Sequence, residues 1–409
     1  MSSARRGGQL KVTFILILTN NDHLNCFMEP GDAQYKSPGV YIEEKSSFQL
    51  SIPLLPTAVP AFIGHCGGGY SDLVPKVEKI ASLPDFVALF GASCALYDHL
   101  QLYFDHGGTD CYIVPVQENL NGLLDGMKIL SGIEEPTLLV VPGATFLVHD
   151  EYVSVVRSML QHCADMKNRF ALVDVFAATQ YDTQVIGQHR QDVGEVNLRY
   201  GASYFPFIKV NSEGSSKVMP ASGAIAGIIC RNDTDKGIWK SPANIAFNDD
   251  IEPVVLLNER QNELLNVDAA TGKSINVIRA FAGRGTLTWG ARTLAGNDNE
   301  WRYIAVQRFC SWVGACATKG LAPLVFENND QATWIKARTI TENFLVTLWK
   351  QGAFPGVKQE EAFYVRAGLG QTMTADDINN GQMIIEAGLA QLRPAEFILL
   401  RFTQQAQPH

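Results

Sequence analysis

The pattern of apolar and polar positions between residues 59 and 175 predicts alternating strands and helices. Short, continuously apolar runs predict buried strands, and apolar residues spaced three and four apart predict the helices between them. Because such strands are buried on both faces, the pattern favours an α/β fold with a parallel sheet covered by helices. The predicted strands are residues 61–64, 111–116, 138–141 and 170–175, with a further strand at 204–210.

The predicted helices of this region begin and end at recognisable residues. Ser82 is a candidate N-cap for a helix that continues to residue 90. The helix of residues 96–104 is expected to end at Gly107-Gly108, and an apolar face over 153–163 predicts a third helix. A helix rich in small residues is expected over 222–229.

The pattern changes after about residue 255 and predicts an α+β region. Residues 301–306 alternate and predict a strand, and residues 331–351 form a long amphipathic helix ended by Gly352. We expect the Trp334, Phe344 and Leu348 face of this helix to be core. A short strand at 363–365, a turn capped by Thr374 and a β-prone tail at 394–403 follow.

Each end of the chain carries a β-prone strand in an extended arm. Residues 48–52 alternate with a period of two, and the three prolines 53, 56 and 60 then interrupt any central strand. An unpaired apolar strand is a liability, and insertion into the sheet of a neighbouring molecule removes it. The two arms therefore predict assembly.

The composition excludes several classes of protein. The 409 residues are 46% hydrophobic and 18% charged, which excludes a disordered chain. The net charge of −9 and the lack of basic clusters argue against nucleic acid or a membrane surface as partner. No run of 18 apolar residues predicts a membrane span. The eight cysteines are scattered, as is typical of buried cysteines in a reducing compartment.

Several fragments resemble catalytic motifs but are incomplete. The glycine run at residues 65–69 resembles the oxyanion turn of esterases, but the sequence has no G-x-S-x-G nucleophile motif. The run also lacks the G-K-[ST] ending of a phosphate-binding P-loop. Asp105-His106-Gly107-Gly108 resembles a subtilisin-type histidine segment, but the candidate serine, Ser222, lacks the expected surroundings. A subtilisin-like serine hydrolase stays as an alternative. We expect no catalytic residues, no cofactor and no metal site, and we interpret Asp233, Asp235 and 249–250 as solvated turn carboxylates.

The first 27 residues allow three interpretations. Three basic residues precede an apolar run at 12–18, which loosely imitates a secretory signal, but no small-x-small cleavage site follows. The run also fits a short strand. We favour a translation start placed too far upstream, with Met28 as the native start.

Eight motifs in the same order resemble the contractile tail sheath family of phages, R-type bacteriocins and extracellular contractile injection systems. The resemblance covers roughly residues 35–403. Its motifs are residues 35–44, 57–64, 104–116, 219–227, 237–244, 275–294, 326–330 and 394–398. Ser241 departs from the family's alanine, and Ala221 precedes the serine of the fourth motif.

The resemblance implies a domain organisation. Residues 1–27 would be a leader outside the family pattern and 28–58 an extended N-terminal arm. A subtilisin-like α/β sheath domain would span 59–255, an α+β domain 256–393 and a C-terminal strand arm 394–409. The name subtilisin-like describes the fold, not protease activity.

The resemblance also implies a function, that of a structural subunit of a helical sheath around an inner tube. The arms would pair with neighbouring subunits while the bodies rotate, and a metastable extended sheath would contract to drive the tube through a target membrane. The alternative within the same machine is another structural component. The implied arm residues are Val40, Tyr41, Ile42, Phe48, Leu50 and Ile52 at one end and Phe397, Ile398, Leu399, Leu400 and Phe402 at the other.

The implied partners are copies of the chain, with or without sister sheath proteins, the tube protein, and baseplate and cap proteins. Polar residues of the long helix, Lys336, Arg338 and Glu342, are candidates for the tube contact. Nucleic acid and direct membrane insertion are not expected. The expected location is the bacterial cytoplasm during assembly and then a phage tail or a released particle.

Overall fold

The computed structural model describes residues 51–66, 76–117, 119–212, 215–393 and 396–405. Before residue 51 only the backbone of four two-residue strands is described, and these pair antiparallel as β1 with β4 and β2 with β3. The chain divides into two compact units, Met1–Ser51 and Ile52–His409, and the second is described below. The four short strands are β1 Val12–Thr13, β2 Ile17–Leu18, β3 Leu24–Asn25 and β4 Glu43–Glu44.

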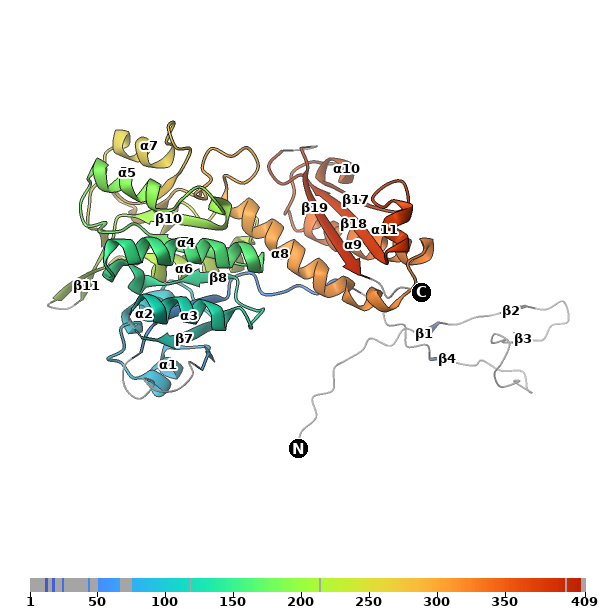
Figure 1. The fold of residues 1–409 in the computed structure, drawn as a ribbon, viewed down its shortest axis with the longest axis horizontal. Coiled ribbons are helices and arrows are strands. Elements are labelled where there is room, and N and C mark those ends of the chain that lie inside the picture. Colours follow the sequence, from blue (N-terminus) through green and yellow to red (C-terminus); the bar gives the residue numbers. More distant parts are fainter. Residues whose placement is uncertain are drawn as a thin grey trace. The chain divides into compact units, whose positions relative to one another are not determined.

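A nine-stranded sheet forms the centre of the second unit, in the order β13-β16-β15-β10-β9-β8-β5-β7-β6 (Figure 1). The six strands from β15 to β7 are parallel, and antiparallel strands flank them at both edges. The α/β prediction is therefore confirmed. The strands are β5 Pro60–His65, β6 Glu78–Ile80, β7 Cys111–Val116, β8 Leu138–Val140, β9 Phe170–Asp174, β10 Gly201–Phe205, β13 Ile245–Ala246, β15 Ile275–Phe281 and β16 Gly285–Trp289.

Helices cover both faces of the sheet because successive strand residues point to opposite sides. On β5, Phe62 joins one apolar cluster, whereas Ala61 and Ile63 join another. The first cluster includes residues of α1 Leu83–Phe90, α2 Tyr97–Asp105 and α6 Ser222–Lys236, and the second includes residues of α3 Leu120–Leu130 and α4 His149–Met166. The remaining helical elements of this region are η1 Pro142–Phe146, α5 Thr183–Asp192, η2 Leu198–Tyr200 and α7 Glu259–Asn266.

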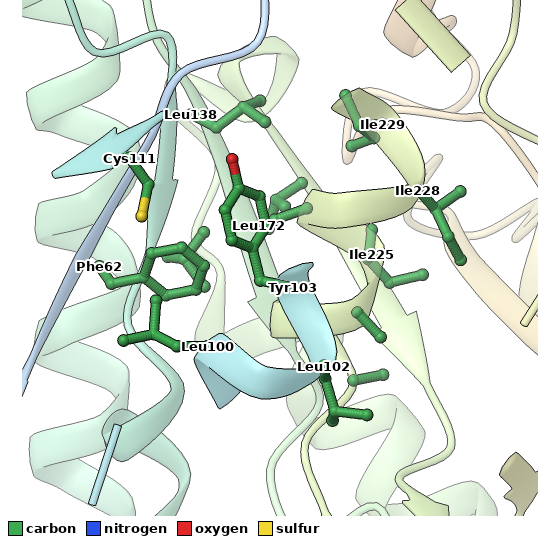
Figure 2. Close-up of a cluster of buried hydrophobic side chains, with 14 of the residues drawn as sticks. Phe62, Leu100, Leu102, Tyr103, Cys111, Leu138, Leu172, Ile225, Ile228 and Ile229 are labelled. Atoms are coloured by element: carbon green, nitrogen blue, oxygen red, sulfur yellow. The ribbon is translucent and has the colours of Figure 1, made fainter. Parts of the chain in front are cut away.

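The first cluster is packed around Tyr103 of α2, as Figure 2 shows. The Tyr103 ring lies 5.3 Å from the Phe62 ring, edge to face. Its hydroxyl donates to the carbonyl oxygen of Thr109 at 3.2 Å. The tyrosine therefore contributes apolar contact inside the cluster while its polar atom is satisfied.

A small antiparallel sheet stands beside this body, in the order β12-β11-β14. It is a hairpin of β11 Ile208–Ser212 and β12 Ser215–Met219, extended by β14 Ile251–Pro253. The single strand predicted over 204–210 is thus the end of β10 followed by β11, with the cis peptide Phe205-Pro206 between them.

The C-terminal part combines helices with a three-stranded antiparallel sheet in the order β17-β18-β19. Its long helix begins after Asp330, whose carboxylate accepts from the Thr333 N–H at 3.0 Å, and Gly352 follows with φ +84°. The elements are α8 Ile304–Leu321, η3 Ala322–Phe326, α9 Gln331–Lys350, α10 Gln359–Ala362, β17 Phe363–Ala367, α11 Ala375–Asn379, β18 Gln382–Leu389 and β19 Ile398–Gln405.

Two expectations differ from this arrangement. The strand predicted over 301–306 is wrong, because α8 begins at Ile304. The domain boundary expected after residue 255 lies before β15 and β16, yet both strands belong to the nine-stranded sheet.

Residues Ile304–Phe326 are long and apolar enough to cross a membrane by length and composition alone, which the search for 18 consecutive apolar residues missed. Half of the matching window is buried inside the molecule. The buried side chains of α8 include Ile304, Phe309 and Leu321. A core helix has the same length and composition.

Candidate functional site

The C-terminal strand β19 pairs along its full length with β18 of its own chain, from Gln382 with Gln405 to Leu389 with Ile398. Ile398 and Phe402 are buried, and Leu400 is half-buried. This differs from the expectation of a free arm, because one edge of the strand is already occupied. Any pairing with a neighbouring subunit must use the other edge or displace β18.

Aromatic and charged side chains cover one stretch of this small sheet. The Phe397 ring lies 5.0 Å from the Tyr364 ring, and the Arg401 Nε lies 3.2 Å from a carboxylate oxygen of Glu386. Leu399 is 53% exposed.

The order β17-β18-β19 gives β17 and β19 no second strand partner among the described residues. Such edges present N–H and C=O groups on which a further strand can align. The sheet therefore offers two edges for strand addition.

The N-terminal arm residues fall into two groups. Val40, Tyr41, Ile42, Phe48 and Leu50 lie outside the residues whose side chains are described.

Ile52, by contrast, is buried in its own chain. A Cβ added at Gly320 of α8 would lie 2.7 Å from the Ile52 Cα, so the two backbones are in close contact. Residue 52 is not part of a strand, and residues 52–58 of the expected arm belong to the second compact unit.

The three candidates for tube contact all lie on α9, outside its buried face. Lys336 forms an ion pair with Glu327, and Arg338 lies 3.6 Å from Glu342 one turn on. Their side chains are 43%, 41% and 36% exposed for Lys336, Arg338 and Glu342 respectively. They are accessible, although already engaged with charges of their own chain.

The apolar face of α9 is core, as predicted. Phe344 and Leu348 are buried, whereas Trp334 is half-buried. The Trp334 indole N–H donates to the Asn329 side chain at 2.7 Å, which satisfies its one polar atom.

His106, the histidine of the protease-like fragment, has both ring nitrogens engaged with backbone. Nδ1 donates to the Leu102 carbonyl at 2.7 Å, and Nε2 accepts from the Asn248 N–H at 3.2 Å. The ring is fully buried, and burial lowers its pKa. His106 therefore caps α2 and has no nitrogen left for a nucleophile.

Ser222 is equally remote from solvent. Its N–H and that of Ala221 donate to one carboxylate oxygen of Asp174, at 3.0 and 2.8 Å. Burial raises the pKa of Asp174 to about 6. The carboxyl group thus lies at the first turn of α6, where backbone N–H groups point outward.

A serine–histidine contact that sequence reasoning missed lies inside the core. Ser203 Oγ is 2.7 Å from His189 Nε2, and the Tyr152 hydroxyl is 3.2 Å from His189 Nδ1. All three residues are buried. The distances resemble those of a catalytic pair. The group is nevertheless a satisfied buried polar network, because no substrate atom can reach it.

A cavity of about 20 Å³ lies where the strand order reverses between β5 and β8. Open α/β sheets bind their ligands at this kind of place. The cavity is lined by Gly64, His65, His99, Pro142 and Phe146 among others, and its volume is roughly that of one water molecule. Among the described residues, the hollow is therefore small for a substrate.

Carboxylate clusters do not form a metal site in the described part of the chain. The interpretation of Asp233 as a solvated carboxylate is wrong. Its two oxygens lie 3.0 and 2.7 Å from the guanidinium nitrogens of Arg308, and both residues are buried.

The comparisons with known proteins decide the family. A family model described as the phage tail sheath protein central domain matches residues 118–294. The PVC sheath complex of an extracellular contractile injection system, in its contracted state, contains a chain 33% identical to this one, with a TM-score of 0.73. The alignment covers 91% of this chain and 99% of that chain. The protein belongs to the contractile tail sheath family.

Two further sheath-family structures come from the anti-feeding prophage. The chain of its contracted helical sheath is 35% identical, with a TM-score of 0.71 and coverage of 91% and 100%. A chain of its six-fold symmetrised baseplate is 36% identical, with a TM-score of 0.70 and coverage of 91% and 99%. Comparison with proteins of curated function gave no match.

The sheath motifs found in the sequence lie at packing contacts. In the 219–227 motif, a Cβ at Gly223 would lie 2.6 Å from the His99 carbonyl oxygen and one at Gly227 2.3 Å from that of Tyr103. The two glycines, one helical turn apart, therefore let α2 approach α6 closely.

The 237–244 sheath motif links α6 to α8. Gly237 has φ +89° and lies against the Trp239 ring, which in turn is 6.2 Å from the Phe309 ring of α8. The Asn232 amide donates to the Lys240 carbonyl at 2.9 Å. In this sheath protein the residues of the motif position helices α6 and α8.

Proposed function

We propose that this chain is the repeating subunit of a contractile sheath that assembles helically around an inner tube. The observation that carries the proposal is the match over nine-tenths of the chain to subunits of contracted sheaths at 33% and 35% identity. The body is a helix-covered sheet of the kind that can rotate as a unit, and the small C-terminal sheet offers two open edges.

The assembly proceeds by strand addition. A strand of the N-terminal arm of one subunit, centred on residues 40–50, adds to an edge of the β17-β18-β19 sheet of another. The β19 segment, including Leu399 and Leu400, supplies the other linking strand. Head-to-tail contacts that do not close into a ring generate a filament, and the added strands keep it continuous while the bodies rotate.

The sheath contracts from a metastable extended state and drives the tube through a target membrane. Its free energy comes from the difference between two packings of the same folded subunit, summed over the filament. The exposed side of α9, with Lys336, Arg338 and Glu342, faces the tube. The α/β body has the subtilisin-like topology, and the partners are copies of the chain, tube, baseplate and cap proteins. Assembly takes place in the bacterial cytoplasm before release as a phage-tail-like particle.

The hydrolase alternative is not favoured by the geometry. His106 is buried, and both of its ring nitrogens are bonded to backbone atoms. The family is one of structural proteins. A hydrolase would lose an activity on His106→Ala, whereas the sheath subunit has none that depends on this residue.

Electron microscopy of negatively stained protein tests the proposal. The purified full chain is expected to form tubes or contracted rings. Deletion of residues 28–51 and deletion of residues 397–405 are each expected to abolish them, while circular dichroism of the first variant stays unchanged because the deleted residues precede the second compact unit. Helical tubes from both deletion variants would contradict strand addition, and a full chain that stays monomeric with its tube protein would contradict the sheath function.

A further inference from the structure

We infer that residues 52–57, here called the arm root, form a fixed anchor on helix α8 and stay bound to it when the sheath contracts. The inference rests on the proposed function, because it assigns a part of a contracting subunit that does not move relative to the body. Figure 1 shows the blue segment after residue 50 passing alongside α8 on its way to the central sheet.

The root follows one stripe of α8. The side of the helix that it covers consists of residues spaced four apart, which share one face. From the C-terminal end towards the N-terminal end of the helix, these residues are Gly320, Cys316, Trp312 and Arg308.

Each of the four residues makes its own contact with the root. Gly320 lies against Ile52, where any Cβ would approach to 2.7 Å. The Leu55 N–H points to the Cys316 Sγ at 3.5 Å, and the Leu55 carbonyl accepts from the Trp312 indole N–H at 2.8 Å.

Arg308 makes the last contact and extends it into the body. Its Nη2 donates to the Thr57 carbonyl at 3.0 Å and to Asp233 of α6 at 2.7 Å. Arg308 and Asp233 are both buried, so the pair is shielded from water.

The lengths of the two segments agree. Twelve helical residues from 308 to 320 rise about 18 Å at 1.5 Å each. Five steps from residue 52 to residue 57 cover about 17 Å when the chain is extended. The root is therefore long enough to follow this stretch of α8 from Ile52 to Thr57 with little slack.

The root then enters the central sheet without a flexible connection. The Val59 N–H donates to the Thr137 Oγ at 2.8 Å, and the Thr137 N–H donates to the Val59 carbonyl at 2.8 Å. Residue 60 is the first residue of β5.

A pull on Ile52 acts along the root and loads all of these contacts at once, in shear. These contacts connect the root to α8, to α6 and to the central sheet. A force on the root is therefore passed to all three elements, and the body turns as a unit. The boundary between the two compact units lies between Ser51 and Ile52, where the anchor begins.

Hydrogen exchange of the full-length chain tests the anchor without any assembly. Peptides covering residues 52–62 are expected to be protected, and Gly320→Val is expected to speed their exchange at least tenfold by lifting the root. Gly314→Ala is the matched control on the same helix, because a Cβ there has no atom within 4 Å. Unprotected exchange in the parent chain, or no effect of Gly320→Val, would overturn the anchor even if no sheath formed.

A reversible crosslink tests whether the root stays on α8 in assembled sheath–tube particles. Leu55→Cys places a thiol beside the native Cys316, and Leu55→Cys with Cys316→Ser is the control that cannot form the disulfide. Oxidised and reduced particles are expected to contract to the same extent, counted by microscopy, because the root does not leave α8. A block of contraction that appears only in the oxidised single variant and is relieved by a reductant would overturn the inference. Control particles that assemble but never contract would instead contradict the proposed function.

Discussion

Arg308 and Asp233 form a buried, two-point ion pair between α8 and α6. A buried pair is weak evidence for added stability, because both charges lose their hydration. Removal of one partner is costly, however, since the other charge stays buried alone.

We predict that Arg308→Met and Asp233→Leu each lower the free energy of unfolding by about 3–5 kcal/mol. The double variant is expected to lose less than the sum of the two, because no unpaired charge remains. Urea unfolding of the four proteins measures this coupling. Strictly additive losses would show that the two side chains act independently.

At the scale of elements, α2 and α6 are in unusually close contact. Gly223 and Gly227 supply the room, as the distances to the carbonyl oxygens of His99 and Tyr103 show. A methyl group at either position would meet backbone, which cannot rotate away as a side chain can.

We predict that Gly227→Ala destabilises the chain by about 1–3 kcal/mol, although alanine is the better helix former. Gly314→Ala in α8 is expected to be neutral or to stabilise by up to about 1 kcal/mol, because the site is open. Thermal unfolding of both variants gives the comparison. Equal effects of the two substitutions would contradict close helix packing as the reason for the 219–227 motif.

The elements that the sequence predicted well have a single, simple period. The continuous apolar runs of β7 and β9 and the capped helix α9 were located within one or two residues of their observed limits. The start of helix α8 was missed because residues 301–306 alternate in the sequence, whereas only 304–306 belong to the helix and all three are buried. The alternation therefore ran across the helix boundary and imitated a strand.

At the scale of the whole molecule, four buried histidines make stability depend on pH. Burial is the main cause that lowers the pKa values of His99, His162 and His189 to about 4 each, and burial also lowers the pKa of His106. Arg169 adds to this at His162, because its guanidinium lies 2.6 Å from Nε2. A lowered pKa in the folded state favours folding above pH 6.5, and this stabilisation is lost as the pH falls towards 4.

We predict that the free energy of unfolding falls between pH 6.5 and pH 4.5. The loss is up to about 3 kcal/mol for each histidine that is protonated in the unfolded state and neutral in the folded state. Asp174 opposes the trend. Its raised pKa favours folding below pH 3.8, an effect that is lost as the pH rises through about 6. Asp174→Asn should therefore steepen the loss in acid. Urea unfolding at pH 7.5, 5.5 and 4.5 measures both slopes, and a flat profile for the parent chain would refute the assignment.

The sequence identified the family, but not the contacts that join residues 52–57 to the body. Arg308 lies in an otherwise apolar stretch, and a buried arginine requires a partner. That signal was present, yet the partner Asp233 is 75 residues away and follows only from the packing of α6 on α8. Likewise, the pairing of β19 with β18 depends on a strand that no clear alternation predicted.

The arm root and the stretch of α8 that it follows have matching lengths. Because residues 52–57 match the length of three helical turns, adding or removing one residue would move every later contact by about 3.3 Å, out of register with Trp312 and Arg308. A change of length within residues 52–57 would therefore break the contacts with α8. For an engineer who wishes to adjust the reach of one subunit towards the next, these six residues are a segment whose length has to be kept.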